Sequence, residues 1–154
     1  MKIENCTISD YNQIIENIVD FWGSDRTLGV HHPMFIHEFG NTSYVIREND
    51  MVVAYMFAFL SQTSLTGYVH LLGVHKDWQH KDLNSKLYNQ FITYAKANGC
   101  NQIKAITIPT NLVSISFHKK MGMSLLGNRN SDGVEIIESY AGPGQDRVVF
   151  VMDI

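Results

Sequence analysis

Apolar residues recur along the chain with two different periods, which separate predicted strands from predicted helices. Alternating or continuous apolar runs predict strands over residues 1–7, 42–47, 51–62, 68–75, 102–108, 123–126, 134–137 and 147–152. Helical spacing predicts helices over residues 10–22, 82–97 and 111–121, and a short one over residues 34–39. Polar turns at residues 48–50 and 64–67 join three successive strands into an antiparallel meander. This order predicts a single mixed α+β domain, residues 1–154, around a central sheet.

Residues that favour helix ends support these boundaries. Ser9 and Asp10 are N-cap types at the start of the first helix, and Gly23 follows its last apolar residue. Asn98 and Gly99 follow the second helix, and Asn111 can cap the third.

The composition is that of an ordinary globular domain, with 45% hydrophobic and 18% charged residues. The net charge of -3 gives no basic surface, so neither nucleic acid nor an anionic membrane is expected as a partner. The longest apolar run, Met51 to Leu60, is half a membrane span and predicts a buried strand. Cys6 and Cys100 are far apart, and the N-terminus has no basic stretch followed by an apolar one. We therefore expect buried free thiols and a cytoplasmic protein.

A candidate anion site lies where the strand over residues 68–75 leads through a polar loop into the helix over residues 82–97. Leu83, Leu87 and Phe91 form the apolar stripe of that helix. The first N–H groups of a helix have no partner within it, and the helix dipole favours an anion there. This stretch therefore predicts a phosphate site.

Two motifs resemble those of the GNAT N-acetyltransferases. Val74 and Gln79 match the cofactor signature Val-x(4)-Gln/Arg-x-x-Gly-x-Gly/Ala, although Asp82 and Asn84 replace its two glycines. The pattern Asn-x-x-Ala-x-x-Phe/Tyr-Tyr-x-Lys-x-Gly-Phe is matched at almost every anchor by Asn111, Ser114, Phe117, His118, Lys120, Gly122 and Met123. The motifs follow one another in the family's order, so the chain is identified as a member. A segment from Gly142 to Arg147 also resembles a subset of the family, although a tight turn is the favoured interpretation.

The resemblance implies a GNAT fold: a mixed, mostly antiparallel sheet that is splayed at an acyl-CoA cleft, with helices on both faces. It implies acetyl-CoA as co-substrate and no metal. The residues it assigns to the cofactor are Leu72, Gly73 and Val74 on the pantetheine arm, Gln79, His80, Lys81, Asp82, Leu83, Asn84 and Ser85 around the pyrophosphate, and Asn111 near the thiol. Gly73 also suits a bulge or a close backbone approach.

His118 stands where the family has a tyrosine that protonates the departing thiolate. A tyrosine, with a pKa of about 10, is protonated at neutral pH, whereas a histidine, with a pKa of about 6.5, is mostly neutral. A neutral imidazole still donates one N–H, so His118 can serve as the acid. A histidine that packs or caps a carbonyl is the alternative interpretation.

The replaced glycines affect the anion site. Asp and Asn tolerate left-handed backbone better than other non-glycine residues, so the loop shape can survive. The charge of Asp82 opposes an incoming phosphate, while its carboxylate can cap the helix. Lys76, Lys81 and Lys86 are near enough in sequence to offset part of this charge. We expect an intact fold with coenzyme A affinity weakened by about one to three tenfold steps.

Two further features concern the acceptor amine. Alternation places Tyr68, His70 and Leu72 on one face of their strand, which makes His70 a candidate general base unless a bulge intervenes. Tyr68 is a second candidate, and a histidine satisfied within the sheet is the alternative for His70.

The segment from Trp22 to Phe39 holds the candidate substrate residues Trp22, Arg26, His31 and Phe35. Core and lid packing explains its aromatic residues equally well. His31, His32, His37 and Glu38 form a weak metal pattern, because adjacent histidines rarely share one metal.

Two functions remain open. The first is an N-acetyltransferase that moves an acetyl group directly to a primary amine of a small molecule or peptide in a ternary complex. The second is a catalytically weakened module that binds acyl-CoA or another ligand. The acidic balance favours a cationic amine such as a polyamine or amino sugar, and family members commonly form homodimers.

Overall fold

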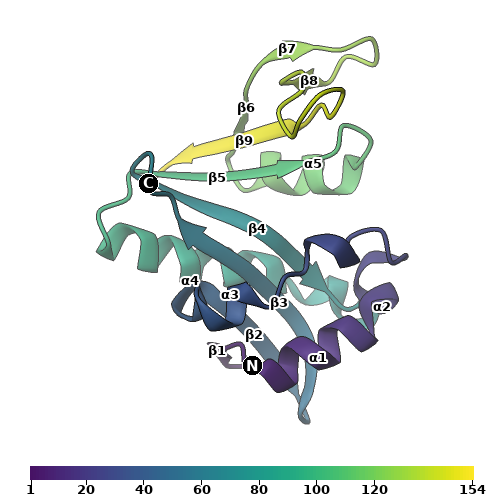
Figure 1. Ribbon diagram of the computed structural model, residues 1–154, viewed down its shortest axis with the longest axis vertical. Helices are drawn as coiled ribbons and strands as arrows, with labels where there is room; N and C mark the ends of the chain where they lie inside the picture. Colours follow the sequence, from purple (N-terminus) through teal and green to yellow (C-terminus); the bar gives the residue numbers. More distant parts are fainter.

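A seven-stranded sheet crosses the molecule in the order β1-β2-β3-β4-β5-β9-β6, and a separate hairpin is made by β7 and β8 (Figure 1). The computed structural model describes all 154 residues. The strands are β1 (Ile3–Asn5), β2 (Ser43–Glu48), β3 (Met51–Leu60), β4 (Thr66–Val74), β5 (Gln102–Thr107), β6 (Ser124–Leu125), β7 (Asn128–Arg129), β8 (Glu135–Ile136) and β9 (Val148–Asp153). The α-helices are α1 (Ile8–Glu16), α2 (Ile18–Trp22), α3 (Met34–His37), α4 (Leu83–Ala97) and α5 (Leu112–Lys120). Short 3₁₀ helices are η1 (Leu28–Val30), η2 (Gly40–Thr42) and η3 (Lys76–Lys81).

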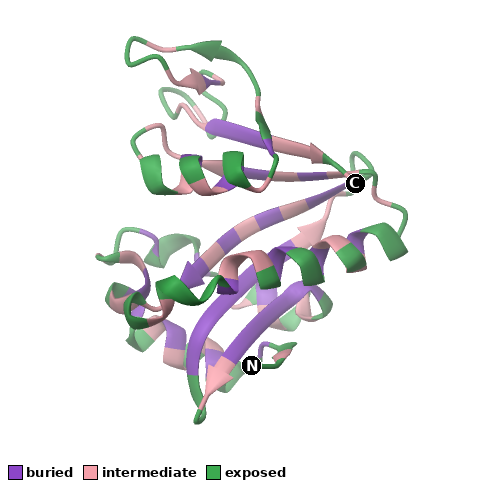
Figure 2. Ribbon diagram, turned by 180° about the vertical axis from the view of Figure 1, so that it is seen from behind, coloured by how far each residue is buried: buried purple, intermediate pink, exposed green.

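Helices cover both faces of the sheet, and each face has its own core. On one face, Ile14 of α1, Phe21 of α2 and Phe35 of α3 pack with Tyr55 and Phe57 of β3. On the other face, the inward side chains of α4 and α5 pack with alternate residues of β3, β5 and β9, among them Met56, Phe91, Ile103, Ile115 and Phe150. Strands β2 and β3 are buried along most of their length, whereas the helices expose their outer sides (Figure 2). The predicted α+β architecture with helices on both faces is confirmed.

The sheet opens between β4 and β5, its only parallel pair. Their pairing runs from Thr66 opposite Gln102 to Val69 opposite Ala105 and then stops. Both strands continue beyond that point and diverge (Figure 1). The edge of β4 from residue 70 to residue 74 therefore faces no strand, as expected for a splayed sheet.

A β-bulge in β4 lies at the same point. Phe57 pairs with Leu71 and Ala58 with Val69, so His70 has no partner in β3. An extra residue of this kind breaks the two-residue alternation of side chains. Tyr68 and His70 share the face of α3, whereas Leu72 packs into the core beneath α4. The prediction that Leu72 shares their face is wrong for this reason.

The N-terminal helix differs from its prediction at its start and in its middle. Thr7 is the N-cap, and it forms a capping box with Asp10, so neither Ser9 nor Asp10 caps the helix itself. The helical run breaks at Asn17 into α1 and α2. Gly23 ends α2 in a left-handed conformation, with φ at 73°, as predicted.

The three-strand meander and the short helix α3 are confirmed. Asn49 and Asp50 join β2 to β3 with φ values of 49° and 65°, which fits a two-residue hairpin turn of type I′. Strand β7 and the 3₁₀ helices have no counterpart in the prediction, because such short elements carry no clear period.

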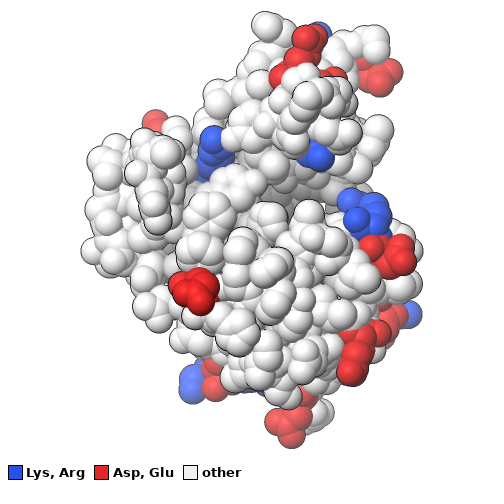
Figure 3. Space-filling view, in the orientation of Figure 1, with Lys and Arg blue, Asp and Glu red and all other residues white.

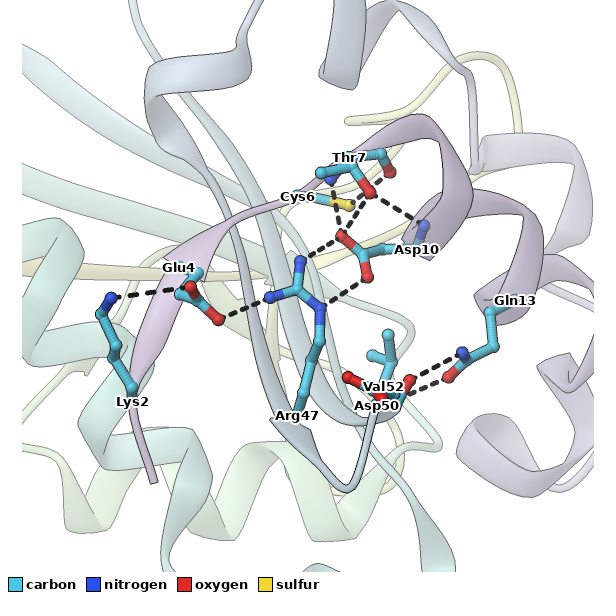
Figure 4. A network of polar contacts seen from close by, with 9 residues as sticks. All are labelled: Lys2, Glu4, Cys6, Thr7, Asp10, Gln13, Arg47, Asp50 and Val52. Atoms are coloured by element: carbon cyan, nitrogen blue, oxygen red, sulfur yellow. Dashed lines mark hydrogen bonds and ion pairs between the residues drawn. The ribbon is translucent and has the colours of Figure 1, made fainter.

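A network of charges fastens α1 to the sheet (Figure 4). The guanidinium of Arg47 donates to both carboxylate oxygens of Asp10, at 2.8 Å and 2.6 Å, and to Glu4 at 2.6 Å. Burial alone would raise the pKa of Asp10, but hydrogen bonds from Arg47 and Thr7 outweigh it and hold that pKa below its usual value.

The longest helix, α4, is amphipathic, and no helix is both long and apolar enough to span a bilayer.

Candidate active site

The predicted anion site is built from the end of β4, the 3₁₀ helix η3 and the start of α4. Gln79, His80 and Lys81 lie exposed along η3. Asp82 has left-handed backbone, with φ at 55° and ψ at 33°, and α4 begins at the next residue. This agrees with the expectation that an aspartate tolerates left-handed backbone at this position. Asn84 lies within the first turn of α4, where the backbone is helical, so its position does not require a residue that tolerates left-handed backbone.

The carboxylate of Asp82 does not cap the helix. It accepts a hydrogen bond from the Ser85 hydroxyl at 2.8 Å, and no backbone N–H donates to it. The prediction that it satisfies the first amides of α4 is therefore wrong, and those amides stay available to an anion. The side-chain oxygen of Asn84 is buried beside them without a hydrogen-bond partner.

The neighbouring lysines compensate for the charge of Asp82 less than expected. Lys76 forms an ion pair with Asp20 of α2 at 2.7 Å. The ammonium of Lys81 lies 5.9 Å from the centre of the Trp78 ring, and Lys86 is exposed. Of the three, Lys76 is already committed to another carboxylate.

Gly73 lies on the open edge of β4, and a side chain there would collide with Tyr55. A Cβ at this position would be 2.5 Å from a carbon of the Tyr55 ring. The bulge that Gly73 was expected to form is instead at His70, and the close approach is that of an aromatic side chain.

Tyr55 takes part in a buried chain of polar groups. The carbonyl of Thr27 can only accept, so His31 Nδ1 carries the proton and donates to it at 2.8 Å. His31 Nε2 then accepts from the Tyr55 hydroxyl at 2.6 Å, and the Trp22 indole donates to that hydroxyl oxygen at 2.6 Å. Burial lowers the pKa of His31. This chain fixes the neutral form of His31 in the core.

The four predicted substrate residues differ in accessibility. Phe35 is 1% exposed and lies between Phe57 and His70, with ring centres 5.6 Å and 4.7 Å away. His31 is 3% exposed. Trp22 is half-buried, and the exposed Arg26 places its guanidinium 5.7 Å from the Trp22 ring. Trp22 and Arg26 are thus the two that solvent reaches.

His70 has one free ring nitrogen. Its Nε2 donates to the carbonyl of Val30 in η1 at 2.9 Å, which leaves Nδ1 as a hydrogen-bond acceptor in the neutral ring. Burial lowers the pKa of His70 and outweighs the bond to Val30. Beside it, burial raises the pKa of Tyr68 to about 12. At neutral pH, the bulge therefore holds an unprotonated imidazole next to a protonated phenol.

His118 is buried, and both of its ring nitrogens are bonded. Nδ1 donates to the Ser114 carbonyl at 2.7 Å, and Nε2 accepts from the Tyr88 hydroxyl at 2.7 Å. The ring stacks on Phe150 with centres 4.2 Å apart, and burial lowers the pKa of His118. Tyr88 is not among the predicted site residues, although it directly follows Leu87 of the apolar stripe. The one sequence feature that could have indicated a role for Tyr88 is its hydroxyl, because a hydroxyl in a buried stretch requires a hydrogen-bond partner.

Asn111 begins α5, as predicted, and its side-chain oxygen accepts from the backbone of Ser114 at 3.2 Å. The described residues contain no group of three or more histidine, cysteine, aspartate or glutamate side chains that would hold a metal ion. The Gly142–Arg147 segment is a tight turn closed by backbone hydrogen bonds, including one from Gln145 to Gly142 at 2.9 Å.

The sheet opens beside the N-terminus of α4, and comparison with known proteins gives the family. Residues 11–123 match the model of the Acetyltransferase (GNAT) family, so the chain belongs to that family. A search of curated protein sequences found no significant match.

Solved structures share the fold at low sequence identity. A GNAT-family protein from Desulfovibrio desulfuricans has a TM-score of 0.79 and 13% identity, over 99% of this chain and 98% of that one. Naa20 from Chaetomium thermophilum, in complex with a bisubstrate analogue, has a TM-score of 0.78 and 15% identity, over 100% and 87%. The NatC complex bound to Gag peptide and CoA has a TM-score of 0.74 and 14% identity, over 100% and 99%. At these identities the likeness shows the fold alone.

Proposed function

We propose that this protein is an acetyl-CoA-dependent N-acetyltransferase that moves an acetyl group to a primary amine by direct transfer in a ternary complex. The acceptor is a small molecule, and the enzyme works in the cytoplasm, where Cys6 and Cys100 stay reduced.

The unpaired edge of β4 carries this proposal. From residue 70 to residue 74 its backbone groups have no strand on the β5 side, and this edge leads through η3 to the free amides of α4. An extended pantetheine arm with amide groups can pair with such an edge as a strand would. The pyrophosphate at its end would meet the helix N-terminus.

The reaction needs a base for the amine and a proton for the thiolate. In the proposed mechanism, Nδ1 of His70 takes a proton from the amine, the amine nitrogen bonds to the thioester carbonyl carbon, and the carbon–sulfur bond breaks. His118 stands at the family's proton-donor position. Both of its ring nitrogens are bonded in this conformation, and only Nδ1 carries a proton, so donation to the thiolate requires the bond from Nδ1 to the Ser114 carbonyl to open.

A thiol-release assay with acetyl-CoA and a panel of primary amines tests the activity. Amine-dependent release of coenzyme A above the hydrolysis background supports it. Changing His70→Gln should lower kcat at least about 100-fold, as loss of a general base does. The matched control is His37→Gln, because His37 is exposed and lies in α3. Equal kcat values for the two variants would exclude His70 as the base.

A weakened binding module is the second candidate, and the bonded state of His118 and the incompletely compensated charge of Asp82 favour it. Calorimetry separates the two functions. Saturable binding of acetyl-CoA without release against any amine supports the module. A fall in kcat of His118→Ala, with cofactor affinity unchanged, supports the enzyme.

A further inference from the structure

Two cations without carboxylate partners lie on the acceptor side of the splayed sheet. Lys104 of β5 and Arg147, which directly precedes β9, are both half-buried, and neither is within 4.0 Å of an acidic oxygen. Arg147 donates to the carbonyl of Asp146 at 2.7 Å, but the Asp146 carboxylate accepts from the backbone of Ser139. The remaining side-chain N–H groups of both residues are therefore available to an anionic ligand.

The sheet register puts both cations on the face of His70. Tyr68 pairs with Lys104 in the parallel ladder, and paired residues point to the same face. In β9, Val148, Phe150 and Met152 face the core beneath α4 and α5, so alternation places Arg147 on the opposite face. Lys104, Arg147 and Tyr68 therefore share the face of the candidate base.

The loop after β8 completes this group. It is an ordered turn, and it brings Tyr140 over β5 so that the Lys104 ammonium lies 5.1 Å from the centre of the Tyr140 ring. Burial is the main cause of the raised pKa of Tyr68; nearby Tyr140 raises it further and nearby Arg147 lowers it. In the space-filling view, a hollow separates the two halves of the molecule, and basic side chains lie along its edge (Figure 3).

We propose that Lys104, Arg147, Tyr68 and Tyr140 form an anion subsite, which selects an acceptor that carries a carboxylate or phosphate besides its amine. Two cations and two phenols supply the donors that such a group needs. The Tyr68 ring centre is 6.3 Å from that of His70, so an anion at the subsite leaves an amine a few bonds away at the imidazole. This inference rests on the proposed transfer activity and gives its substrate class. It also reverses the expectation of a polyamine, because the local charge of the cleft is opposite to the net charge of the chain.

Paired acceptors test the subsite in the thiol-release assay. We would compare 4-aminobutyrate with butylamine for a carboxylate, and glucosamine 6-phosphate with glucosamine for a phosphate. In at least one pair, the anionic amine should have a kcat/KM higher by about 10- to 100-fold, the worth of a charge-assisted hydrogen bond. Lys104→Gln and Arg147→Gln should remove most of this preference through KM, because they should lower the kcat/KM of the anionic amine far more than that of the neutral amine. Arg147→Lys should restore part of it, and Lys96→Gln, on the exposed side of α4, serves as the control.

Binding without turnover separates failure of the subsite from failure of the transfer reaction. The same four amines are titrated by calorimetry into the protein saturated with coenzyme A, and melting temperatures verify that each variant is folded. Tighter binding of an anionic amine that is lost in Lys104→Gln and Arg147→Gln supports the subsite even if no acetyl transfer occurs. Equal binding and equal kcat/KM within both pairs, or a preference that survives in both variants, would overturn it.

Discussion

Arg47 and Arg147 lie in opposite halves of the splayed sheet, and they differ in what surrounds their charge. Arg47 joins Glu4 and Asp10 in a closed network that fixes α1 against β2. Arg147 has only the backbone carbonyl of its neighbour. A cation whose partners belong to the protein stabilises the fold, whereas one without partners is available to a ligand. The N-terminal half thus holds the scaffold, and the C-terminal half supplies free charge to the cleft.

Exchange of each arginine for methionine tests this contrast most strongly. Arg47→Met should lower the free energy of unfolding by about 2–4 kcal/mol, because Asp10 loses its partner while its side chain stays buried. Arg147→Met should change it by less than about 0.5 kcal/mol. Urea unfolding of both variants gives the comparison. Equal losses would contradict the division between scaffold and ligand charges.

The packing around Tyr55 predicts a difference in stability between substitutions at two glycines, Gly73 and Gly29. Gly73→Ala should cost about 1–3 kcal/mol, since its Cβ meets a ring that Trp22 and His31 hold in place. Gly29→Ala, where a Cβ meets nothing within 4 Å, is the control. If thermal unfolding gives the same loss of stability for both variants, then β4 or the Tyr55 ring shifts to accept the extra methyl group, despite the hydrogen bonds of Tyr55.

Buried histidines occur in both halves and predict the pH dependence of stability. Burial lowers the pKa of His31, His70 and His118 below the ordinary value of 6.5. Their contribution to the free energy of unfolding is complete above about pH 6.5. It is lost as the pH falls toward the lowered pKa values of the folded state, because the unfolded chain then binds more protons than the folded chain. The melting temperature should therefore fall between about pH 7.5 and about pH 5.5.

The variant His118→Gln is expected to show a shallower fall over the same range. A slope identical to that of the wild type would show that His118 binds the same number of protons in the folded and unfolded states, which would contradict its lowered pKa.

The smallest effect concerns the charge of Asp82. Asp82→Asn keeps the tolerance of left-handed backbone but removes the charge, and it should raise coenzyme A affinity by about tenfold. Asp82→Gly should give a similar gain if charge rather than backbone shape limits binding. Calorimetry measures both, with Asp132→Asn in the distant hairpin loop as the control. Unchanged affinity in both variants would disprove the repulsion.

Part of the site could be predicted from local sequence. Asp82 occupies left-handed backbone because few other residues tolerate it, and Asn111 caps α5 because its side chain reaches the third amide of the helix. The side-chain partners could not be predicted. Tyr88 and His118 meet from different helices, and Tyr140 reaches Lys104 only because the loop after β8 folds over β5.

The sequence by itself determined the order of strands and helices, the family motifs and the conformation at the start of α4, because these depend on neighbours within a few residues. Tertiary structure decided where the β4–β5 pairing stops and that a bulge at His70 turns Leu72 to the other face. It also decided which charges remain free. Register, bulges and ion pairs are set by contacts between residues far apart in the chain. They cannot be read from one strand, because its pattern of apolar and polar residues is the same whichever strand it pairs with.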